Sequence, residues 1–388
     1  MEVTHSSLLK IARSSSPEEL IQKGDLFSSM WREVFVTAEK MKASDIHIIQ
    51  EDDDVIVKLR ILGDLFTIKE IPNENDIRTI LINRLKAICR FDLSVTDEAQ
   101  DRAFSLKITN SRYRSVLTPG IFGENFVFRV IRETDLPRIS DCSIPDHIST
   151  DLLFAINQRQ GFICITGPTG SGKSTTLQAA IMEIDRLKKN VITIEDPVER
   201  IIPGVVQQQI TSKLTWAKAI KSAMRQDPDV ILVGEIRDVE SAKLALEASQ
   251  TGHLVLATLH TNNVAGIVDR LIGLGVEKRI IADNLLFISA QRLVQRLCPD
   301  CRIKRLDFGF DRGKGCDKCS DSKIAGIKGR TSLIEYSFRP NSESIINFNK
   351  ETFEHKELKT TLASEAKRLA SIGEISFDEF QYWSHDGI

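Results

Sequence analysis

The segment GPTGSGKS, residues 167–174, is the part of this sequence that most constrains the fold. It matches the pattern G-x-x-x-x-G-K-[ST], follows the apolar run GFICIT and precedes a helical pattern. A loop of this kind holds phosphate oxygens with backbone N–H groups that converge at the N-terminus of a helix. The sequence therefore predicts a nucleotide-phosphate site on a strand–loop–helix unit.

The residue types in this loop have distinct expected tasks. The glycines allow the backbone to curve around the β- and γ-phosphates, and Lys173 neutralises phosphate charge. The hydroxyl of Ser174, or in second place that of Thr175, is expected to bind Mg²⁺. The predicted ATP-binding residues are Gly167, Pro168, Thr169, Gly170, Ser171, Gly172, Lys173, Ser174 and Thr175.

Further apolar runs follow the loop at residues 191–194, 230–233 and 254–259, with helical patterns between them. This alternation predicts an α/β domain with a mainly parallel sheet. In such sheets, ligands bind at the edge formed by the carboxyl ends of the strands. Polar residues that directly follow these runs are therefore candidates for the site.

Acidic residues follow two of these runs. ITIEDPVE places Glu195, Asp196 and Glu199 at the first, and VILVGEIRD places Glu235 at the second. Any one of the first three alone is as often a solvated loop charge, but a cluster beside a phosphate loop favours a water-activating base. Glu235 is expected to approach the magnesium ion or its water.

Two histidines flank the third run in TGHLVLATLHTN. His260 follows the run, where a parallel sheet binds its ligands, whereas His253 precedes it. A lone histidine often has a structural role, and this alternative applies above all to His253. His260 is therefore the candidate for phosphate contact.

The cysteines predict a second site. Four of the seven form two pairs, CPDC and CDKC, which is the ligand set of a closed tetrahedral Zn²⁺ site. Because no position is left open, the metal is expected to be structural; an iron–sulfur centre and a redox dithiol pair are the alternatives. Cys89, Cys142 and Cys164 lie in apolar segments and are expected to be core residues. The predicted zinc ligands are Cys298, Cys301, Cys316 and Cys319.

The remaining sequence predicts a multidomain chain. Helical spacing at residues 30–41 and strand-like runs up to residue 132 indicate a smaller mixed α/β domain, and the proline-containing segment TDLPRISDCSIPDH indicates a linker. The predicted organisation is a flexible tail at 1–28, a mixed α/β domain at 29–138, a hinge at 139–145 and a nucleotide-binding domain at 146–388, which includes a zinc subdomain at 298–332 and C-terminal helices at 341–388.

Composition excludes several classes. A net charge of −2 with 41% hydrophobic and 27% charged residues indicates neither disorder nor general polyanion binding. No stretch is apolar over eighteen residues, and the N-terminus has no signal-peptide pattern, so a cytoplasmic location is expected. A nucleic-acid translocase needs a basic channel with aromatic residues, and no such cluster is visible, so no direct nucleic-acid contact is expected.

The four blocks GPTGSGKS, ITIEDPVE, VILVGEIRD and TGHLVLATLHTN, in this order, resemble the Walker A, Asp box, Walker B and His box of the secretion ATPase superfamily of type II secretion and type IV pilus motors. Upstream, ASDIHI, VKLRILGDL and TPGIFGENFVFRVI resemble the N-terminal domain signatures of that family. The resemblance covers about residues 30–388. It implies a RecA-like ATPase domain preceded by a PAS-like domain.

The resemblance also implies roles for individual residues. Glu199 of the Asp box is expected to act as general base, and Glu235 of the Walker B block to help hold magnesium. Arg114 and Arg129 match arginines that reach the γ-phosphate from the N-terminal domain and stabilise transition-state charge. The alternative for both arginines is an ordinary place on a strand surface.

The function implied is that of a homohexameric motor that hydrolyses ATP and moves an inner-membrane platform protein from the cytoplasmic face. A tetracysteine insert followed by GRTSLIEY, residues 329–336, resembles secretion and assembly ATPases and is typically missing from retraction ATPases. Two departures leave the docking mode open: fewer than about thirty residues precede the first matching helix, and only fourteen separate the cysteine pairs. The sequence also leaves open a DNA-uptake or conjugation relative and a nucleotide-gated scaffold without turnover.

Overall fold

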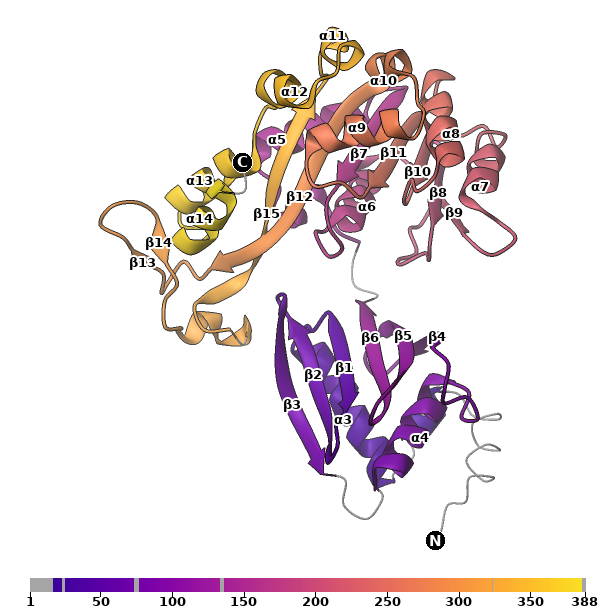
Figure 1. The fold of residues 1–388 in the computed structure, drawn as a ribbon, viewed down its shortest axis with the longest axis vertical. Helices are drawn as coiled ribbons and strands as arrows, with labels where there is room; N and C mark the ends of the chain where they lie inside the picture. Colours follow the sequence, from indigo (N-terminus) through magenta and orange to yellow (C-terminus); the bar gives the residue numbers. More distant parts are fainter. Residues whose placement is uncertain (1–16, 23–24, 73–76, 133–135, 323, 386–388) are drawn as a thin grey trace. The chain divides into compact units, whose positions relative to one another are not determined.

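The computed structural model describes residues 17–22, 25–132 apart from 73–76, 136–322 and 324–385 (Figure 1). The chain divides into two compact units, here called the N-terminal unit (residues 1–134) and the C-terminal unit (residues 135–388). The division lies four residues before the predicted boundary at 138. Among the described residues, no helix is both long enough and apolar enough to cross a membrane.

The N-terminal unit is an antiparallel sheet with helices. Its strands follow the order β3-β2-β1-β6-β5-β4, and every neighbouring pair is antiparallel. The elements are α2 (Pro17–Gln22), α3 (Leu26–Lys40), β1 (Asp45–Gln50), β2 (Asp54–Ile61), β3 (Asp64–Pro72), α4 (Ile77–Cys89), β4 (Gln100–Leu106), β5 (Ser111–Gly120) and β6 (Gly123–Arg132).

The core of this unit lies between the sheet and its helices. Burial alternates along β2 and β6, as expected for strands with one face on a core. Helix α3 begins at its N-cap Asp25, which accepts a hydrogen bond from Ser28 N, and it buries Trp31 and Phe35. The indole of Trp31 donates to Leu81 O of α4 at 3.0 Å, which joins the two helices.

Helix α2 lies within the segment predicted as a flexible tail, residues 1–28. Leu20 and Ile21 are fully buried in the core of the N-terminal unit. Two apolar residues on a six-residue helix are too few to show periodicity, so the sequence does not reveal this packing. Residues 1–16 of the predicted tail lie outside the described residues.

The C-terminal unit is built on a mainly parallel sheet, which confirms the predicted fold class. The strand order is β15-β12-β7-β11-β10-β8-β9, and within the described part of this sheet only the β12–β15 pair is antiparallel. In chain order, the elements of this unit from its start to β11 are η2 (Ile139–Cys142), α5 (Asp146–Ile156), β7 (Gly161–Thr166), α6 (Lys173–Glu183), β8 (Val191–Glu195), β9 (Val206–Gln209), α7 (Trp216–Ala223), β10 (Val230–Val233), α8 (Val239–Gln250) and β11 (Leu254–Leu259).

Apolar clusters cover both faces of this sheet. Strands β7, β8, β10 and β11 are therefore buried along their whole length, which explains their unbroken apolar sequences. The predicted hinge at 139–145 contains η2, where Ile139 is buried in one of these clusters.

Strands β12 (Leu285–Leu297) and β15 (Ile327–Phe338) extend beyond the other strands of the sheet (Figure 1). Helices α13 (Leu362–Ser371) and α14 (Phe377–His385) pack on this extension around Leu333 and Val294. The chain between the two strands forms the cysteine-containing excursion. The remaining elements are α9 (Val264–Gly273), α10 (Lys278–Asn284), β13 (Ile303–Lys304), β14 (Phe310–Asp311), η3 (Asp317–Ser322), α11 (Ser342–Ile346) and α12 (Lys350–Glu357).

Candidate nucleotide site and tetracysteine cluster

The predicted phosphate loop joins the end of β7 to the first residue of α6. Gly167, Gly170 and Gly172 have φ angles of 143°, 80° and 89°, which glycine adopts without the cost that a side chain would add. A Cβ atom on Gly167 would also lie 2.7 Å from Ser171 Oγ. The glycine pattern of the motif is therefore a requirement of this backbone path.

Lys173 lies inside the loop at the N-terminus of α6. Its Nζ donates to Gly167 O at 2.7 Å and to Pro168 O at 3.0 Å. Burial lowers the pKa of Lys173 below its usual value, and the negative charge of Glu235 opposes this shift. The ammonium group is thus held at the mouth of the loop in a partly desolvated position, where it attracts an anion strongly.

The loop also fits a phosphate group by its hydrogen-bonding capacity. The Ser171 hydroxyl is buried and has no hydrogen-bond partner among the described residues. Buried polar groups normally have a partner, so an unpaired hydroxyl inside a cationic loop indicates a ligand position. The helix N-terminus contributes further N–H donors and a positive dipole at the same place.

Glu235 and His260 meet at the carboxyl edge of the sheet. Glu235 follows β10, His260 follows the neighbouring parallel strand β11, and His260 Nε2 lies 3.1 Å from Glu235 Oε1. Arg237 Nη2 lies 2.7 Å from the other oxygen, and this hydrogen bond raises the pKa of Arg237. Glu235 is therefore the centre of a charged cluster on the same edge as the phosphate loop.

The acids of the ITIEDPVE block lie in different environments. Glu195 is buried and accepts from Thr193 Oγ1 at 2.6 Å and from Gln207 Nε2 at 3.1 Å. Asp196 is exposed and Glu199 is half-buried in the loop that follows. The hydrogen bonds engage Glu195 within its own sheet.

The loop that carries Glu199 is attached to the phosphate-loop helix. Arg200 Nη1 donates to Gln178 Oε1 of α6 at 2.7 Å. On the other side, Gln207 Nε2 of β9 donates to Arg200 O at 2.9 Å. The loop after β8 is thus fixed between α6 and β9, beside the helix that begins at Lys173.

His253 lies at the opposite end of β11 from His260. Its Nδ1 is 2.9 Å from Ala248 O and 3.2 Å from Thr251 Oγ1, at the C-terminus of α8. These contacts satisfy the last turn of that helix. The structure therefore gives His253 a local structural contact and separates it from the cluster around Glu235.

Three polar residues beside the phosphate loop were not predicted from the sequence. The Thr166 hydroxyl donates to Leu259 O and accepts from Thr261 N, which joins the ends of β7 and β11. Gln291 of β12 accepts from Thr176 Oγ1 of α6, and Arg292 follows Gln291 along the same strand. The signal in the sequence was the first of the two Gln-Arg pairs within the otherwise mainly apolar run LLFISAQRLVQRL.

Arg114 and Arg129 lie directly opposite each other on the neighbouring strands β5 and β6. Arg114 pairs with Asp101 at 3.1 Å, and Arg129 pairs with Asp45 at 3.3 Å. Their side chains are 46% and 57% exposed, so both guanidinium groups stay accessible on one face of the sheet.

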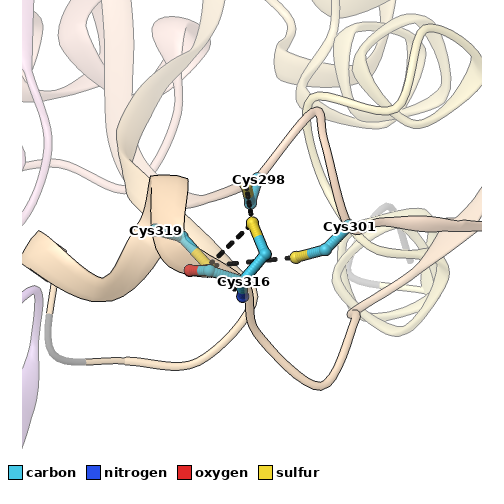
Figure 2. A group of neighbouring side chains, drawn as sticks. All are labelled: Cys298, Cys301, Cys316 and Cys319. Atoms are coloured by element: carbon cyan, nitrogen blue, oxygen red, sulfur yellow. Dashed lines mark hydrogen bonds between the residues drawn. The ribbon is translucent and has the colours of Figure 1, made fainter.

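The four predicted zinc ligands converge between β12 and η3 (Figure 2). The Sγ atoms of Cys298 and Cys316 are 3.8 Å apart and those of Cys301 and Cys319 are 3.9 Å apart, within a cluster no wider than 4.8 Å. Four sulfurs at about 2.3 Å from a central Zn²⁺ ion would have similar separations.

Backbone geometry adds to this fit. Cys316 N donates to Cys319 Sγ at 3.2 Å, and this hydrogen bond lowers the pKa of the Cys319 thiol to about 7, whereas burial raises the pKa of the Cys301 and Cys316 thiols. A lower thiol pKa favours the thiolate, which is the form that binds metal. The donor set therefore suits a closed structural site.

Comparison with known proteins shows the family and the fold of this chain. The family model described as type II/IV secretion system protein matches residues 23–381. Type II secretion system protein E of Aeromonas hydrophila is 36% identical over 349 residues, which cover 82% of this chain and 68% of that protein. Type II secretion system ATPase E of Vibrio cholerae serotype O1 is 35% identical over 349 residues, covering 83% and 68%. The chain thus spans about two thirds of the length of these relatives.

Solved structures show the same fold. The ATPase DotB of Legionella pneumophila has a TM-score of 0.71 and 25% identity over 92% of this chain and 96% of that one. The pilus retraction motor PilT, solved with bound ADP, has a TM-score of 0.66 and 25% identity over 92% and 97%. Because the family model covers most of both units, the resemblance read from the four motif blocks is confirmed, and this chain belongs to the type II/IV secretion system protein family and is a secretion ATPase of that family.

Proposed function

We propose that this ATPase is the motor of a protein-secretion or type IV pilus assembly machine. It works as a homohexamer, recruited to the cytoplasmic face of the inner membrane, and moves a platform protein there. The observation that carries the proposal is the charged cluster around Glu235, which lies on the same sheet edge as the phosphate loop. A site of this kind binds a nucleotide and carries the residues that hydrolysis needs.

Each group in the site has a proposed role. Lys173 and the loop N–H groups bind the phosphates, and Ser174 with Glu235 would hold Mg²⁺, which neutralises charge on the phosphate oxygens when bound. Glu199 accepts the proton of the attacking water. His260 orients Glu235 through the contact of its Nε2 with Glu235 Oε1 at 3.1 Å.

Glu195 has a different role in this proposal from that of Glu199. It is buried and already accepts hydrogen bonds from Thr193 and Gln207, so it positions the loop that carries Glu199. Arg114 and Arg129, side by side on the N-terminal unit, supply positive charge to the γ-phosphate in the transition state. Hydrolysis then shifts the two units relative to each other through the segment around residues 137–145.

Glu235→Gln tests the magnesium role. If Glu235 acts on the metal through a magnesium-bound water, we expect turnover to fall by about 10- to 100-fold and the Mg²⁺ concentration for half-maximal activity to rise. Steady-state phosphate release against Mg²⁺ concentration measures both effects. Glu240→Gln is the matched control, because Glu240 is exposed and pairs only at the surface with Lys221 in the described contacts.

Sedimentation with and without a non-hydrolysable ATP analogue tests assembly in the same preparation. We expect the analogue to favour a hexamer. Wild-type protein that binds ATP but shows no hydrolysis above Glu235→Gln, even when assembled, would contradict the motor proposal and favour a nucleotide-gated scaffold.

We also propose that Cys298, Cys301, Cys316 and Cys319 bind one structural Zn²⁺ ion per chain. Cys301→Ser removes one thiolate, so zinc affinity is expected to fall by at least about a hundredfold, with loss of order between β12 and β15. Zinc content after dialysis and limited proteolysis of residues 302–315 measure the two effects. Cys142→Ser is the control, since Cys142 is a half-buried thiol outside the cluster. Full zinc retention in Cys301→Ser would refute the assignment.

A further inference from the structure

Strand β12 carries two polar residues past the end of β7 and along the phosphate loop. The last pair between these parallel strands is Ala290 with Thr166. Gln291 and Arg292 come next on β12, just where the other strand gives way to the loop. On its far side β12 pairs with β15, so the backbone at Arg292 is fixed opposite Leu333.

Both residues lie against the loop. A Cβ atom on Gly172 would be 2.9 Å from Gln291 Nε2, and a Cβ atom on Gly167 would be 3.3 Å from Arg292 Nη1. The Thr176 hydroxyl donates to Gln291 Oε1 at 3.0 Å. Gly167 and Gly172, the first and last glycines of the loop, therefore lie against consecutive residues of β12.

Arg292 also holds the segment that follows His260. Its Nη2 donates to Asn262 O at 2.6 Å, while its Nη1 donates to Gln291 O at 3.1 Å. A guanidinium group has its donors in one plane at fixed angles, which an ammonium group does not reproduce. One planar group thus lies against Gly167 of the phosphate loop and donates to the loop after β11.

Charged groups from other elements lie around this guanidinium. Burial lowers the pKa of Lys173, and the positive charge of Arg292 adds to that effect. On β15, burial raises the pKa of Glu335, and Arg292 opposes the rise. Glu335 accepts from Val264 N at 2.7 Å, so the same short loop is held at residue 262 by Arg292 and at residue 264 by Glu335.

The guanidinium also lies over an aromatic ring of the last described helix. Arg292 Cζ is 5.9 Å from the ring centroid of Trp383 on α14, within the range of a cation–π contact. The indole N–H of Trp383 donates to Glu379 Oε1 at 2.8 Å, which orients the ring on its helix. Trp383 belongs to the apolar cluster that packs α13 and α14 on β12 and β15.

We propose that Arg292 is a positioning residue for nucleotide binding, which aligns the phosphate loop with the loop that carries His260. Through its contact with Trp383, it also transmits the presence or absence of bound nucleotide to α14. The proposal rests on nucleotide binding at the phosphate loop and is independent of hydrolysis. It adds to the motif residues a group from a strand more than a hundred positions away along the chain.

MgADP binding to the full chain tests this inference without requiring turnover. For Arg292→Gln we expect about tenfold weaker binding, equivalent to ~1.4 kcal/mol. Arg292→Lys is expected to recover only part of the loss, because lysine supplies charge without the planar donors. Arg296→Gln is the matched control on the same strand, since Arg296 pairs with Glu374 at 3.8 Å. We expect its affinity to stay within about twofold of wild type.

Tryptophan emission supplies a readout that a purely structural role would not change. The chain has three tryptophans, so the difference between wild type and Trp383→Phe isolates the Trp383 signal. MgADP is expected to change this signal in wild type and not in a variant with Arg292→Gln.

Three results would overturn the proposal. In the first, Arg292→Gln binds MgADP as tightly as the wild type does. In the second, Arg292→Lys recovers the full affinity of the wild type. In the third, Arg292→Gln lowers the melting temperature, but MgADP raises that temperature by as much as it does in the wild type. A protein that binds MgADP but fails to hydrolyse ATP contradicts the motor and leaves this test intact.

Discussion

Lys173→Ala is expected to reduce ATP turnover by about three orders of magnitude, comparable with the loss of an arginine finger from a phosphoryl-transfer site. The ammonium lies between Gly167 O and Pro168 O at the start of α6, where the helix dipole and loop donors converge. A desolvated cation at this position stabilises the negative charge that develops on the phosphate more than the same cation in water does. Phosphate release at saturating Mg²⁺ measures the loss.

Stability should not account for that loss. Burial disfavours the charged form of Lys173, so its removal is expected to leave the melting temperature unchanged or slightly higher. Lys188→Ala is the control, because that side chain is 84% exposed and pairs only with Asp185 in the described contacts. Turnover of Lys173→Ala above about one tenth of wild type would contradict the phosphate role of this residue.

Glu199→Gln is expected to cause the second large loss of ATP turnover. An amide cannot accept the proton of the attacking water, so we expect turnover to fall by about 10²- to 10³-fold. Nucleotide affinity is expected to persist, because the substitution leaves Lys173 and the phosphate loop intact. Single-turnover hydrolysis together with equilibrium binding of a fluorescent ATP analogue separates the chemical step from binding.

Glu195→Gln is the matched comparison within the same block. The oxygen of a glutamine side chain can still accept from Thr193 and Gln207, so we expect a loss of less than about tenfold. The opposite ranking, with Glu195→Gln inactive and Glu199→Gln active, would assign the base to Glu195. Equal and small losses in both variants would place the water-activating group outside this block.

The sequence predicted those parts of the fold that are set by interactions between residues close together along the chain. The phosphate loop needs its glycines at the positions where φ is positive, and Lys173 needs to start the following helix. Continuous apolar runs predict buried parallel strands, and the structure has them at β7, β8, β10 and β11. Two CxxC pairs likewise predicted a four-thiol cluster, and the four sulfurs lie together.

Contacts between distant segments were not predictable in the same way. Gln291 and Arg292 stand about 120 residues after the phosphate loop, and only the pairing of β12 with β7 places them beside it. The buried packing of Leu20 and Ile21 is equally invisible to periodicity, because α2 is six residues long.

The sequence by itself therefore determined the class of the C-terminal unit and predicted the residues of the two candidate sites, because those depend on residue type and on short-range backbone geometry. Only the tertiary structure decided which polar groups share an environment: Glu235 with His260, Glu195 with Gln207, and Arg292 with the phosphate loop. The physical reason is that a strand's place in a parallel sheet depends on crossover connections and on burial of both faces, which the local sequence does not encode.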